Sequence, residues 1–259
     1  AGEKIMPLIP ICARLDGKGF SKFTKGMERP YDQRLRAVMK HVTTKLVEKA
    51  SALVGYTQSD EISLIFYSDS LDKQLFFDRK IQKMVSVLTA MATFYFQEGL
   101  KEFMPEYYGK EAFFDCRVWA VPNKMEAVNT LVWREIDATK NSISMAAMCY
   151  YSHKQLMNKN GSEKQEMLFQ KGINWNAYPT EFKRGTYIMR QKREMPFSAE
   201  EIEKLPAKHD ARTNPELKVM RTVVTKVELP PIRKIKNKVE VFFDGVEPVL
   251  NDVKESADE

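Results

Sequence analysis

The sequence predicts an α+β protein built on a ferredoxin-like βαββαβ unit. Three observations support this prediction. Strand-like and helix-like segments follow one another in the order strand, helix, strand, strand, helix, strand before Pro122. Only a short polar tip separates the second and third strands, as in a β-hairpin. Both helical segments carry apolar stripes with a helical period. In such a unit the two βαβ halves interleave, so the first and third strands become central neighbours.

The first strand is expected at Ile9–Leu15, an apolar run that ends in a glycine-containing turn. Asp16 then stands at the C-terminal end of the strand, followed by Gly17-Lys18-Gly19. Two glycines around a lysine let the backbone approach a phosphate closely, and they supply N–H donors and one cation. The Walker A spacing is absent, so this turn is a weaker signal than a P-loop.

Asp32 is expected to cap a helix that runs to about Ala52, and the hairpin follows it. The hairpin tip is Gln58-Ser59-Asp60-Glu61, with strand-like residues on both sides. Adjacent acids at a hairpin tip repel each other, and a divalent cation would offset that repulsion. An isolated Ser-Asp-Glu is better explained as a solvated turn. The second carboxylate upstream favours the cation.

The second helix is expected at about Lys73–Phe103 and the fourth strand at Ala112–Val121. Right-handed crossovers place the end of the first strand beside the hairpin tip. Asp16 and Asp60 would therefore meet at one edge of the sheet, where Asp115 also starts the fourth strand. Two carboxylates beside a glycine-rich turn predict a two-metal phosphoryl-transfer site.

A third long helix is expected at Met125–Tyr151, interrupted at Asn141. The stretch from Asp137 to Ser142, which includes Lys140, is polar for a helix centre. It is either an exposed face or a contact with nucleotide or nucleic acid. A short helix is expected at Glu163–Gln170.

Basic residues lie close to aromatic ones after the short helix. Trp175 precedes Lys183 and Arg184, and a strand is expected at Tyr187–Gln191. Aromatic side chains that stack on exposed bases are typical of RNA recognition. A solvated basic loop is an equally good explanation of this spacing.

The composition shifts after Met195, where charged and proline-rich segments begin. A helix is expected at Ser198–Lys204, and strands at Thr222–Leu229 and Val239–Phe243. We therefore divide the chain into a catalytic core (1–122), a helical and basic-loop extension packed on it (123–195) and a C-terminal extension (196–259).

Overall composition limits the function classes. The formal net charge is +6, which permits a polyanionic partner without proving one. Three scattered cysteines suggest reduced thiols in the cytoplasm. No run approaches the roughly 18 apolar residues of a membrane helix, and no signal-peptide pattern is present, so no membrane partner is expected. No Ser/His/Asp or Cys/His arrangement supports covalent acyl chemistry.

Several motifs, taken together and in order, resemble the tRNA-His guanylyltransferase superfamily. They span roughly residues 9 to 190 and are Arg14-Leu15-Asp16-Gly17-Lys18-Gly19-Phe20, Tyr56-Thr57-Gln58-Ser59-Asp60-Glu61, Phe114-Asp115-Cys116-Arg117, Trp133-Arg134, Asn141, Gly172-Ile173-Asn174-Trp175-Asn176 and Lys183-Arg184-Gly185-Thr186. The resemblance implies a polymerase-like palm. It also implies addition of nucleotides to the 5′ end of tRNA in the 3′→5′ direction, after a nucleoside triphosphate has activated the 5′ phosphate.

The resemblance also implies roles for individual residues. Asp16, Asp60 and Glu61 are the implied catalytic residues. Two Mg²⁺ ions would be held by Asp16, the Gly17 carbonyl and Asp60, with Glu61 beside them or sharing one ion. ATP and GTP are the implied substrates. Nucleotide contacts are implied for Arg14, Asp16, Gly17, Lys18, Gly19, Phe20, Ser21, Arg29, Asp32, Ser59, Asp60 and Asn141. RNA contacts are expected at Lys140, Trp175, Lys183 and Arg184. Family members are commonly tetramers, so a homo-oligomer is expected.

Two departures from the family pattern bear on specificity. Ser21 stands where members often have histidine. Thr139-Lys140-Asn141-Ser142 replaces the His-x-Asn-Asn run whose histidine is tied to reading the tRNA-His anticodon. The stretch from Asp137 to Ile143 looks more like the bacterial and archaeal guanylyltransferase-like branch. We therefore expect template-directed repair of truncated tRNA 5′ ends, with obligatory guanylate addition to tRNA-His as the alternative.

Two further functions fit the same residues. A palm with two acids also suits a nucleotidyl cyclase that needs no RNA, because fold does not dictate function. A cyclic product formed from triphosphates without RNA would favour that enzyme. A non-catalytic tRNA-binding module would keep its role after Asp60→Ala, and the intact acids argue against it.

Overall fold

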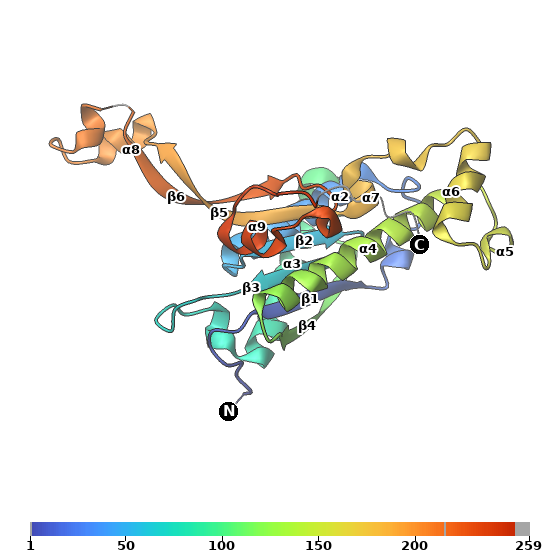
Figure 1. Ribbon diagram of the computed structural model, residues 1–259, viewed down its shortest axis with the longest axis horizontal. Helices are drawn as coiled ribbons and strands as arrows, with labels where there is room; N and C mark the ends of the chain where they lie inside the picture. Colours follow the sequence, from blue (N-terminus) through green and yellow to red (C-terminus); the bar gives the residue numbers. More distant parts are fainter. Residues whose placement is uncertain (1, 215, 252–259) are drawn as a thin grey trace.

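The computed structural model describes residues 2–214 and 216–251. Its centre is one six-stranded sheet in the order β4-β1-β3-β2-β5-β6 (Figure 1). All neighbouring strands are antiparallel. The first four strands have the predicted ferredoxin-like order, and the α+β class is confirmed. The strands are β1 Ile11–Lys18, β2 Val54–Gln58, β3 Glu61–Phe66, β4 Phe113–Ala120, β5 Thr186–Pro196 and β6 Lys218–Val227.

Helices cover both faces of the sheet. Helices α2 (Gln33–Lys49) and α3 (Ile81–Phe103) pack on one face, and α4 (Lys124–Met148) and α9 (Lys238–Asp244) on the other. A hydrophobic core therefore lies on each side of the sheet. The shorter helices are α1 Phe20–Phe23, α5 His153–Leu156, α6 Gly161–Gln170, α7 Thr180–Arg184 and α8 Ala199–Lys204.

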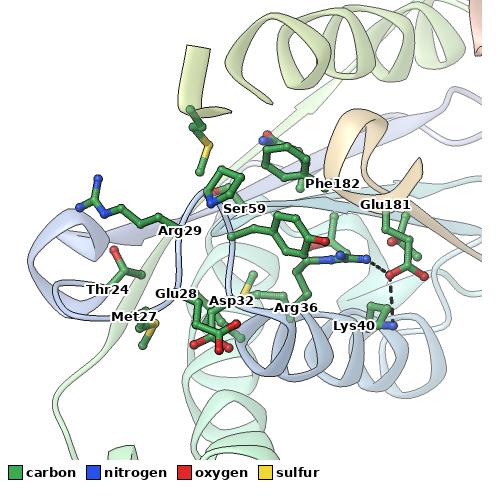
Figure 2. Close-up of a pocket in the computed structure, with 18 of the residues that line it drawn as sticks. Thr24, Met27, Glu28, Arg29, Asp32, Arg36, Lys40, Ser59, Glu181 and Phe182 are labelled. Carbon is green, nitrogen blue, oxygen red and sulfur yellow. Dashed lines mark hydrogen bonds and ion pairs between the residues drawn. The ribbon is translucent and has the colours of Figure 1, made fainter. Parts of the chain in front are cut away.

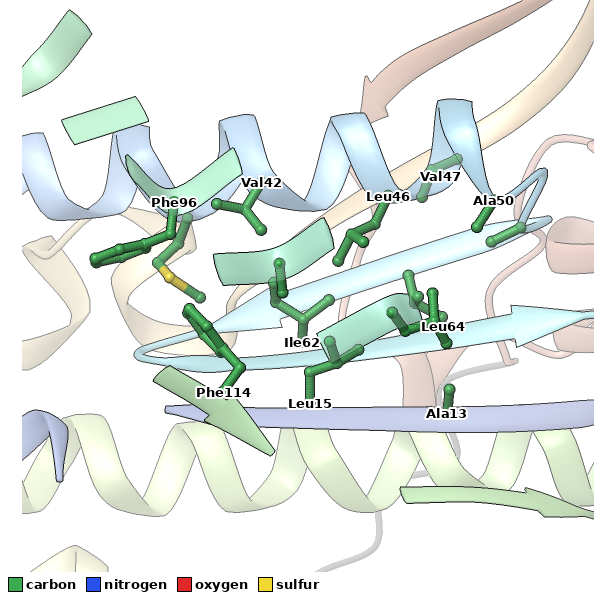
Figure 3. Close-up of a cluster of buried hydrophobic side chains, with 14 of the residues drawn as sticks. Ala13, Leu15, Val42, Leu46, Val47, Ala50, Ile62, Leu64, Phe96 and Phe114 are labelled. Carbon is green, nitrogen blue, oxygen red and sulfur yellow. The ribbon is translucent and has the colours of Figure 1, made fainter. Parts of the chain in front are cut away.

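The alternation of side chains along β1 decides which residues face the site. Leu15 and Ile62 are fully buried in the core under α2 and α3 (Figure 3). Because successive residues of a strand point to opposite faces, Asp16 and Glu61 point to the face that α4 covers. The apolar residues beside the acids thus orient them.

Helix α2 forms as its sequence pattern predicts. The Asp32 side chain accepts a hydrogen bond from the backbone N–H of Arg34 and caps the helix. Val38, Val42 and Leu46 follow at a spacing of four and are each 0% exposed. Truncating the largest of them, Leu46, to alanine costs about 2–5 kcal/mol. Helix α2 therefore supports the β2–β3 hairpin by packing against one face of the sheet.

Two expected boundaries were wrong. Strand β1 ends at Lys18, so Asp16 lies within the strand rather than after it. Helix α3 begins at Ile81, eight residues later than expected. The residues before it, Phe77, Asp78 and Arg79, have φ angles of 46°, 52° and 62°, and an α-helix cannot continue through that conformation.

Two expected features beyond the core were also wrong. Helix α4 continues through Asn141, whose side-chain amide donates back to Asp137 one turn earlier. The expected strand at Val239–Phe243 is helix α9. Val241 and Phe242 are consecutive and both buried, which a short helix on a sheet allows and a half-exposed strand does not.

Strands β5 and β6 are longer than expected and run beyond the rest of the sheet as a two-stranded ribbon, with α8 at its far end (Figure 1). Strand β5 pairs with β2 of the core, so the residues after 122 continue the same sheet. The proposed three-part division of the chain stays a prediction, and its last eight residues, 252–259, lie outside the described residues. No helix in the described part of the chain is long and apolar enough to cross a membrane.

Candidate active site

The predicted acids lie at one edge of the sheet. Asp16 of β1 stands directly opposite Glu61 of β3 on one side and Asp115 of β4 on the other. Ser59 and Asp60 form the two-residue turn of the β2–β3 hairpin, and Ser59 has a φ of 53°. Asp16 and Asp60 line one cavity of about 300 Å³. The sequence prediction that distant aspartates meet is confirmed by this cavity.

The electrostatics of this cavity favour a cation. Burial raises the pKa of Asp60, and the nearby charges of Asp16 and Glu61 raise it further. Within residues 2–214 and 216–251, neither Asp16 nor Asp60 forms an ion pair with a basic side chain. Two carboxylates therefore face this cavity without an ion-pair partner in the described part of the chain, although Arg134, which is paired with Glu61, also lines it.

Glu61 differs from its neighbours because two arginines neutralise it. Arg134 of α4 donates Nε to Oε1 at 2.6 Å and NH2 to Oε2 at 2.7 Å. Arg14 Nε lies 3.2 Å from Oε2 in an ion pair without hydrogen-bond geometry. Arg134 NH2 also donates to Asp137 at 2.8 Å, and Asn141 donates to the same Asp137 oxygen at 3.2 Å. Glu61 thus fixes α4 to the sheet and holds Asn141 at the cavity wall.

These contacts describe the surroundings of two residues to which the resemblance implies a role. Both carboxylate oxygens of Glu61 accept hydrogen bonds from Arg134, so Glu61 can also act on the site through that arginine. Arg14 is likewise turned toward Glu61. The catalytic assignment of Glu61 and the nucleotide contact of Arg14 stay predictions.

The residues around the acids fit a divalent cation of the magnesium type. No group of three histidine, cysteine, aspartate or glutamate side chains in the described residues is close enough to hold a metal ion. Mg²⁺ needs no such cage, since one or two carboxylates and the substrate phosphates suffice. Asp16, Asp60 and the Gly17 carbonyl are the available donors, and the raised pKa of Asp60 marks the uncompensated charge that such an ion would neutralise.

The glycine turn is shaped by an aromatic side chain. A Cβ on Gly17 would collide with the ring of Phe20, which is buried against Phe96 and Phe114. Gly19 has a φ of 69°, the left-handed region that glycine adopts without strain. The side chain of Phe20 therefore belongs to the core, and the predicted nucleotide contact could be made only by its backbone. Lys18 and Ser21 are exposed beside this turn.

A second cavity of about 280 Å³ lies on the other side of the hairpin tip (Figure 2). Gln58, Ser59, Met145 and Met148 line both cavities. Tyr31 and Phe182 form an aromatic wall, with stacked rings 4.6 Å apart, and both contribute to the lining. A mostly apolar cavity of this size with a few polar groups suits a small planar ligand such as a nucleobase.

Charged residues form one end of this second cavity. Glu181 pairs with Arg36, with Lys40 at 3.4 Å and with Lys226 at 2.6 Å. Burial opposes ionisation of Glu181, but the hydrogen bond from Lys226 and the charges of Lys40 and Arg36 outweigh it. They lower its pKa to about 2. This cluster joins α2, α7 and β6, and Figure 2 shows its link to α2.

Arg29 and Asp32, two of the implied nucleotide contacts, line this second cavity and differ in their surroundings. Arg29 is exposed and lines the cavity (Figure 2). Asp32 also lines it but is buried, and its hydrogen bonds from Arg34 lower its pKa. Asp32 is therefore already engaged in capping α2 and binding Arg34. A nucleotide contact of Asp32 stays a prediction.

The predicted RNA contacts fall into two groups. Lys140 is exposed on α4. The other three bond to the protein itself: Trp175 Nε1 donates to Ser142 at 3.2 Å, Lys183 Nζ to the Asn176 carbonyl at 2.6 Å, and Arg184 NH2 to the Leu229 carbonyl at 3.4 Å. Their RNA contacts stay predictions.

Sequence reasoning missed several residues of the site. Arg134 was noticed only as part of a motif, and nothing along the chain indicates that it meets Glu61. Glu135 is a buried carboxylate that accepts hydrogen bonds from Tyr187 and from the Ile232 backbone, both at 2.9 Å. Burial raises the pKa of Glu135. The signal that could have found it is an acid on the apolar face of α4.

Comparison with known proteins places this chain in a family. The profile described as "Thg1: tRNAHis guanylyltransferase" matches residues 1–122. A solved structure of a bacterial tRNA(His) guanylyltransferase (Thg1)-like protein in complex with ATP is 38% identical. It has a TM-score of 0.68, with 73% of this chain and 81% of that chain covered.

This chain belongs to the tRNA(His) guanylyltransferase (Thg1) family.

Two more relatives agree with this membership. A bacterial Thg1-like protein in complex with GTP is 30% identical with a TM-score of 0.68, covering 90% of this chain and 88% of its own. The tRNA(His) guanylyltransferase of Saccharomyces cerevisiae is 29% identical over 207 residues, covering 73% of this chain and 86% of its own. The superfamily expected from the motifs is confirmed, and so is the enzyme class. This Thg1 family member is a nucleotidyltransferase.

Proposed function

We propose that this Thg1 family member adds a nucleotide to the 5′ end of a tRNA. The observation that carries the proposal is the pair Asp16 and Asp60, which face one cavity without a basic partner in the described chain. That cavity shares Ser59 with the aromatic-walled cavity beside it. A nucleotide whose base lies against Tyr31 would bring its phosphates to the two acids.

The reaction needs two displacements at phosphorus. In the first, a 5′-phosphate oxygen of the RNA attacks the α-phosphorus of a triphosphate, and pyrophosphate leaves. In the second, the 3′-hydroxyl of the incoming nucleotide attacks the activated 5′ phosphate, and the nucleoside monophosphate leaves. Bound Mg²⁺ would neutralise phosphate charge and lower the pKa of the attacking hydroxyl.

The residues of the chain contribute binding and orientation. Asp16, Asp60 and the Gly17 carbonyl would hold the metal ions. Lys18 stands exposed beside the glycine turn and can meet a phosphate as a point charge. The Glu61–Arg134 pair keeps α4 and Asn141 in place, so this side of the cavity is already formed when the reacting groups bind.

Guanylate addition to tRNA(His) is the better supported form of this activity. Relatives from Drosophila melanogaster and Saccharomyces cerevisiae that match over most of their length are named probable tRNA(His) guanylyltransferase and tRNA(His) guanylyltransferase. The test is a 5′-monophosphorylated tRNA(His) transcript that lacks the extra 5′ guanylate, incubated with ATP, labelled GTP and Mg²⁺. We expect extension by one nucleotide, loss of extension with EDTA, and none with Asp60→Asn. Extension by Asp60→Asn at the wild-type rate would contradict the assignment.

Template-directed repair of truncated tRNA is the second candidate. Lys140 is exposed on α4, in the segment where eukaryotic members carry the anticodon-linked histidine. Two of the matching structures are titled Thg1-like. A series of tRNAs lacking the first nucleotide, with each base opposite the gap, separates the candidates. Repair requires that the added nucleotide follow the opposing base, and addition of guanylate regardless of that base would exclude it.

A further inference from the structure

A third cavity adjoins the acid cavity along helix α4. It measures about 330 Å³ and is lined by Ser144, Met148, His153, Leu156, Met157, Asn158 and Lys164. Ser144 and Met148 also line the cavity that contains Asp16 and Asp60. The two cavities therefore adjoin at these side chains, and residues of α5 and α6 line the third one.

Helix geometry gives the separation, along α4, of the residues that line the acid cavity and the third cavity. Asn141, Ser144 and Met148 are spaced by three and four residues, so they lie on one face of α4. At 1.5 Å per residue, Asn141 and Met148 are about 10 Å apart along the helix axis. Successive nucleotides of one DNA strand rise about 3.4 Å along the helix axis, and an RNA strand has a similar spacing. Met148, at the border of the third cavity, therefore lies about three stacked nucleotides from Asn141.

The charge of the third cavity is opposite to that of the acid cavity. Lys164 Nζ donates to Ser144 Oγ at 3.0 Å, a neutral partner. Among the described residues no carboxylate lies within 4 Å of this ammonium, whereas Lys159 close by is paired with Glu163 at 2.8 Å. The cavity lining contains no acid. The positive charge of the Lys164 ammonium group is therefore available to bind an anion.

The remaining lining residues suit a nucleotide rather than a simple anion. Met148 and Met157 are 50% and 57% exposed, which is unusual for large apolar side chains. Methionine side chains are adaptable and polarizable surfaces for flat groups. His153 and Asn158 add polar groups at the wall.

We propose that this third cavity binds a backbone phosphate of the acceptor strand of the RNA, about three nucleotides from the reacting 5′ end, with Lys164 as its cation. The inference rests on the proposed function for the identity of the RNA. An RNA strand whose 5′ end lies at Asp60 would carry its next phosphates past Ser144 and Met148, which line both cavities.

The test separates RNA from a free triphosphate as the source of the phosphate. Lys164→Ala is compared with Lys101→Ala, which removes the same charge from an exposed position of α3, on the opposite face of the sheet. Kd is measured by filter binding for a 5′-monophosphorylated acceptor-stem hairpin RNA at several salt concentrations. Kd for ATP is measured separately without RNA.

We expect Lys164→Ala to weaken RNA binding about tenfold and to reduce the slope of log K against log salt by about one. Its affinity for ATP and its rate of nucleotide addition at saturating RNA should stay within twofold. Lys164→Arg, which keeps the charge, should retain RNA affinity within about twofold and so shows that the fold is intact.

Two results would overturn the inference. Equal RNA affinity of Lys164→Ala and Lys101→Ala would show that no phosphate of the RNA reaches this cavity. Loss of ATP affinity in the absence of RNA would assign the cavity to the free nucleotide. If the wild-type protein added no nucleotide but Lys164→Ala still lost RNA affinity, the inference would stand and the proposed function would fail.

Discussion

Replacing Arg134 by methionine should destabilise the protein by about 2–3 kcal/mol. Glu61 is 7% exposed, and Arg134 supplies two of its hydrogen bonds, at 2.6 and 2.7 Å. Removing one partner of a buried ion pair costs about 3–5 kcal/mol, because a charge is left without compensation. Arg14, at 3.2 Å from Glu61, remains and offsets part of this loss.

The measurement is urea unfolding followed by far-UV circular dichroism. Arg117→Met is the matched control, since Arg117 is exposed on β4 and forms no ion pair with another described residue. In a double-mutant cycle with Glu61→Gln, the loss of unfolding free energy in the double variant should be smaller than the sum of the two single losses by at least about 1 kcal/mol. A loss below about 0.5 kcal/mol for Arg134→Met, or a coupling near zero, would refute the assignment of Glu61 as the anchor of α4.

Three further predictions follow from the site. Asp60→Asn should abolish nucleotide addition but raise metal-free stability at pH 7 by up to about 1 kcal/mol. A raised folded-state pKa means that the ionised carboxylate of Asp60 opposes folding. The melting temperature of Asp60→Asn should therefore exceed that of the wild type only when Mg²⁺ is absent. Glu181 has a folded-state pKa of about 2 against 4.5, so it contributes at most roughly 3 kcal/mol, present above pH 4.5 and lost as pH falls toward 2. Glu181→Gln should flatten the stability profile in that window, and an unchanged profile would count against the cluster. Gly17→Ala should lower the melting temperature, because its Cβ meets the ring of Phe20; a neutral result would show that the ring can move.

The core elements were predictable because each has a local signal. The stripe on α2, the Asp32 cap and the two-residue turn of the hairpin depend on residues within one or two turns of each other. The start of α3 was not predictable, since the left-handed run at Phe77–Arg79 contains no glycine or proline to announce it. Helix α9 was mistaken for a strand because five apolar-rich residues fit either period.

The candidate site likewise has one feature that the sequence predicted and one that it did not. That Asp16 and Asp60 approach one another followed from strand order and the handedness of crossovers, which are general rules of chain packing. The ion pair between Glu61 and Arg134 did not follow from these rules. The two residues are 73 positions apart, and only the docking of α4 on the sheet brings them together.

The amino-acid sequence alone determined the order of strands in the core, the edge at which the aspartates gather and the family, because periodicity, turn chemistry and motif order are carried by neighbouring residues. The tertiary structure alone decided which acids are left without a basic partner, where the aromatic-walled cavity forms and how α4 leads from the acids to Lys164. Those properties depend on contacts between segments far apart in the chain, and burial and charge at such contacts exist only once the segments have packed.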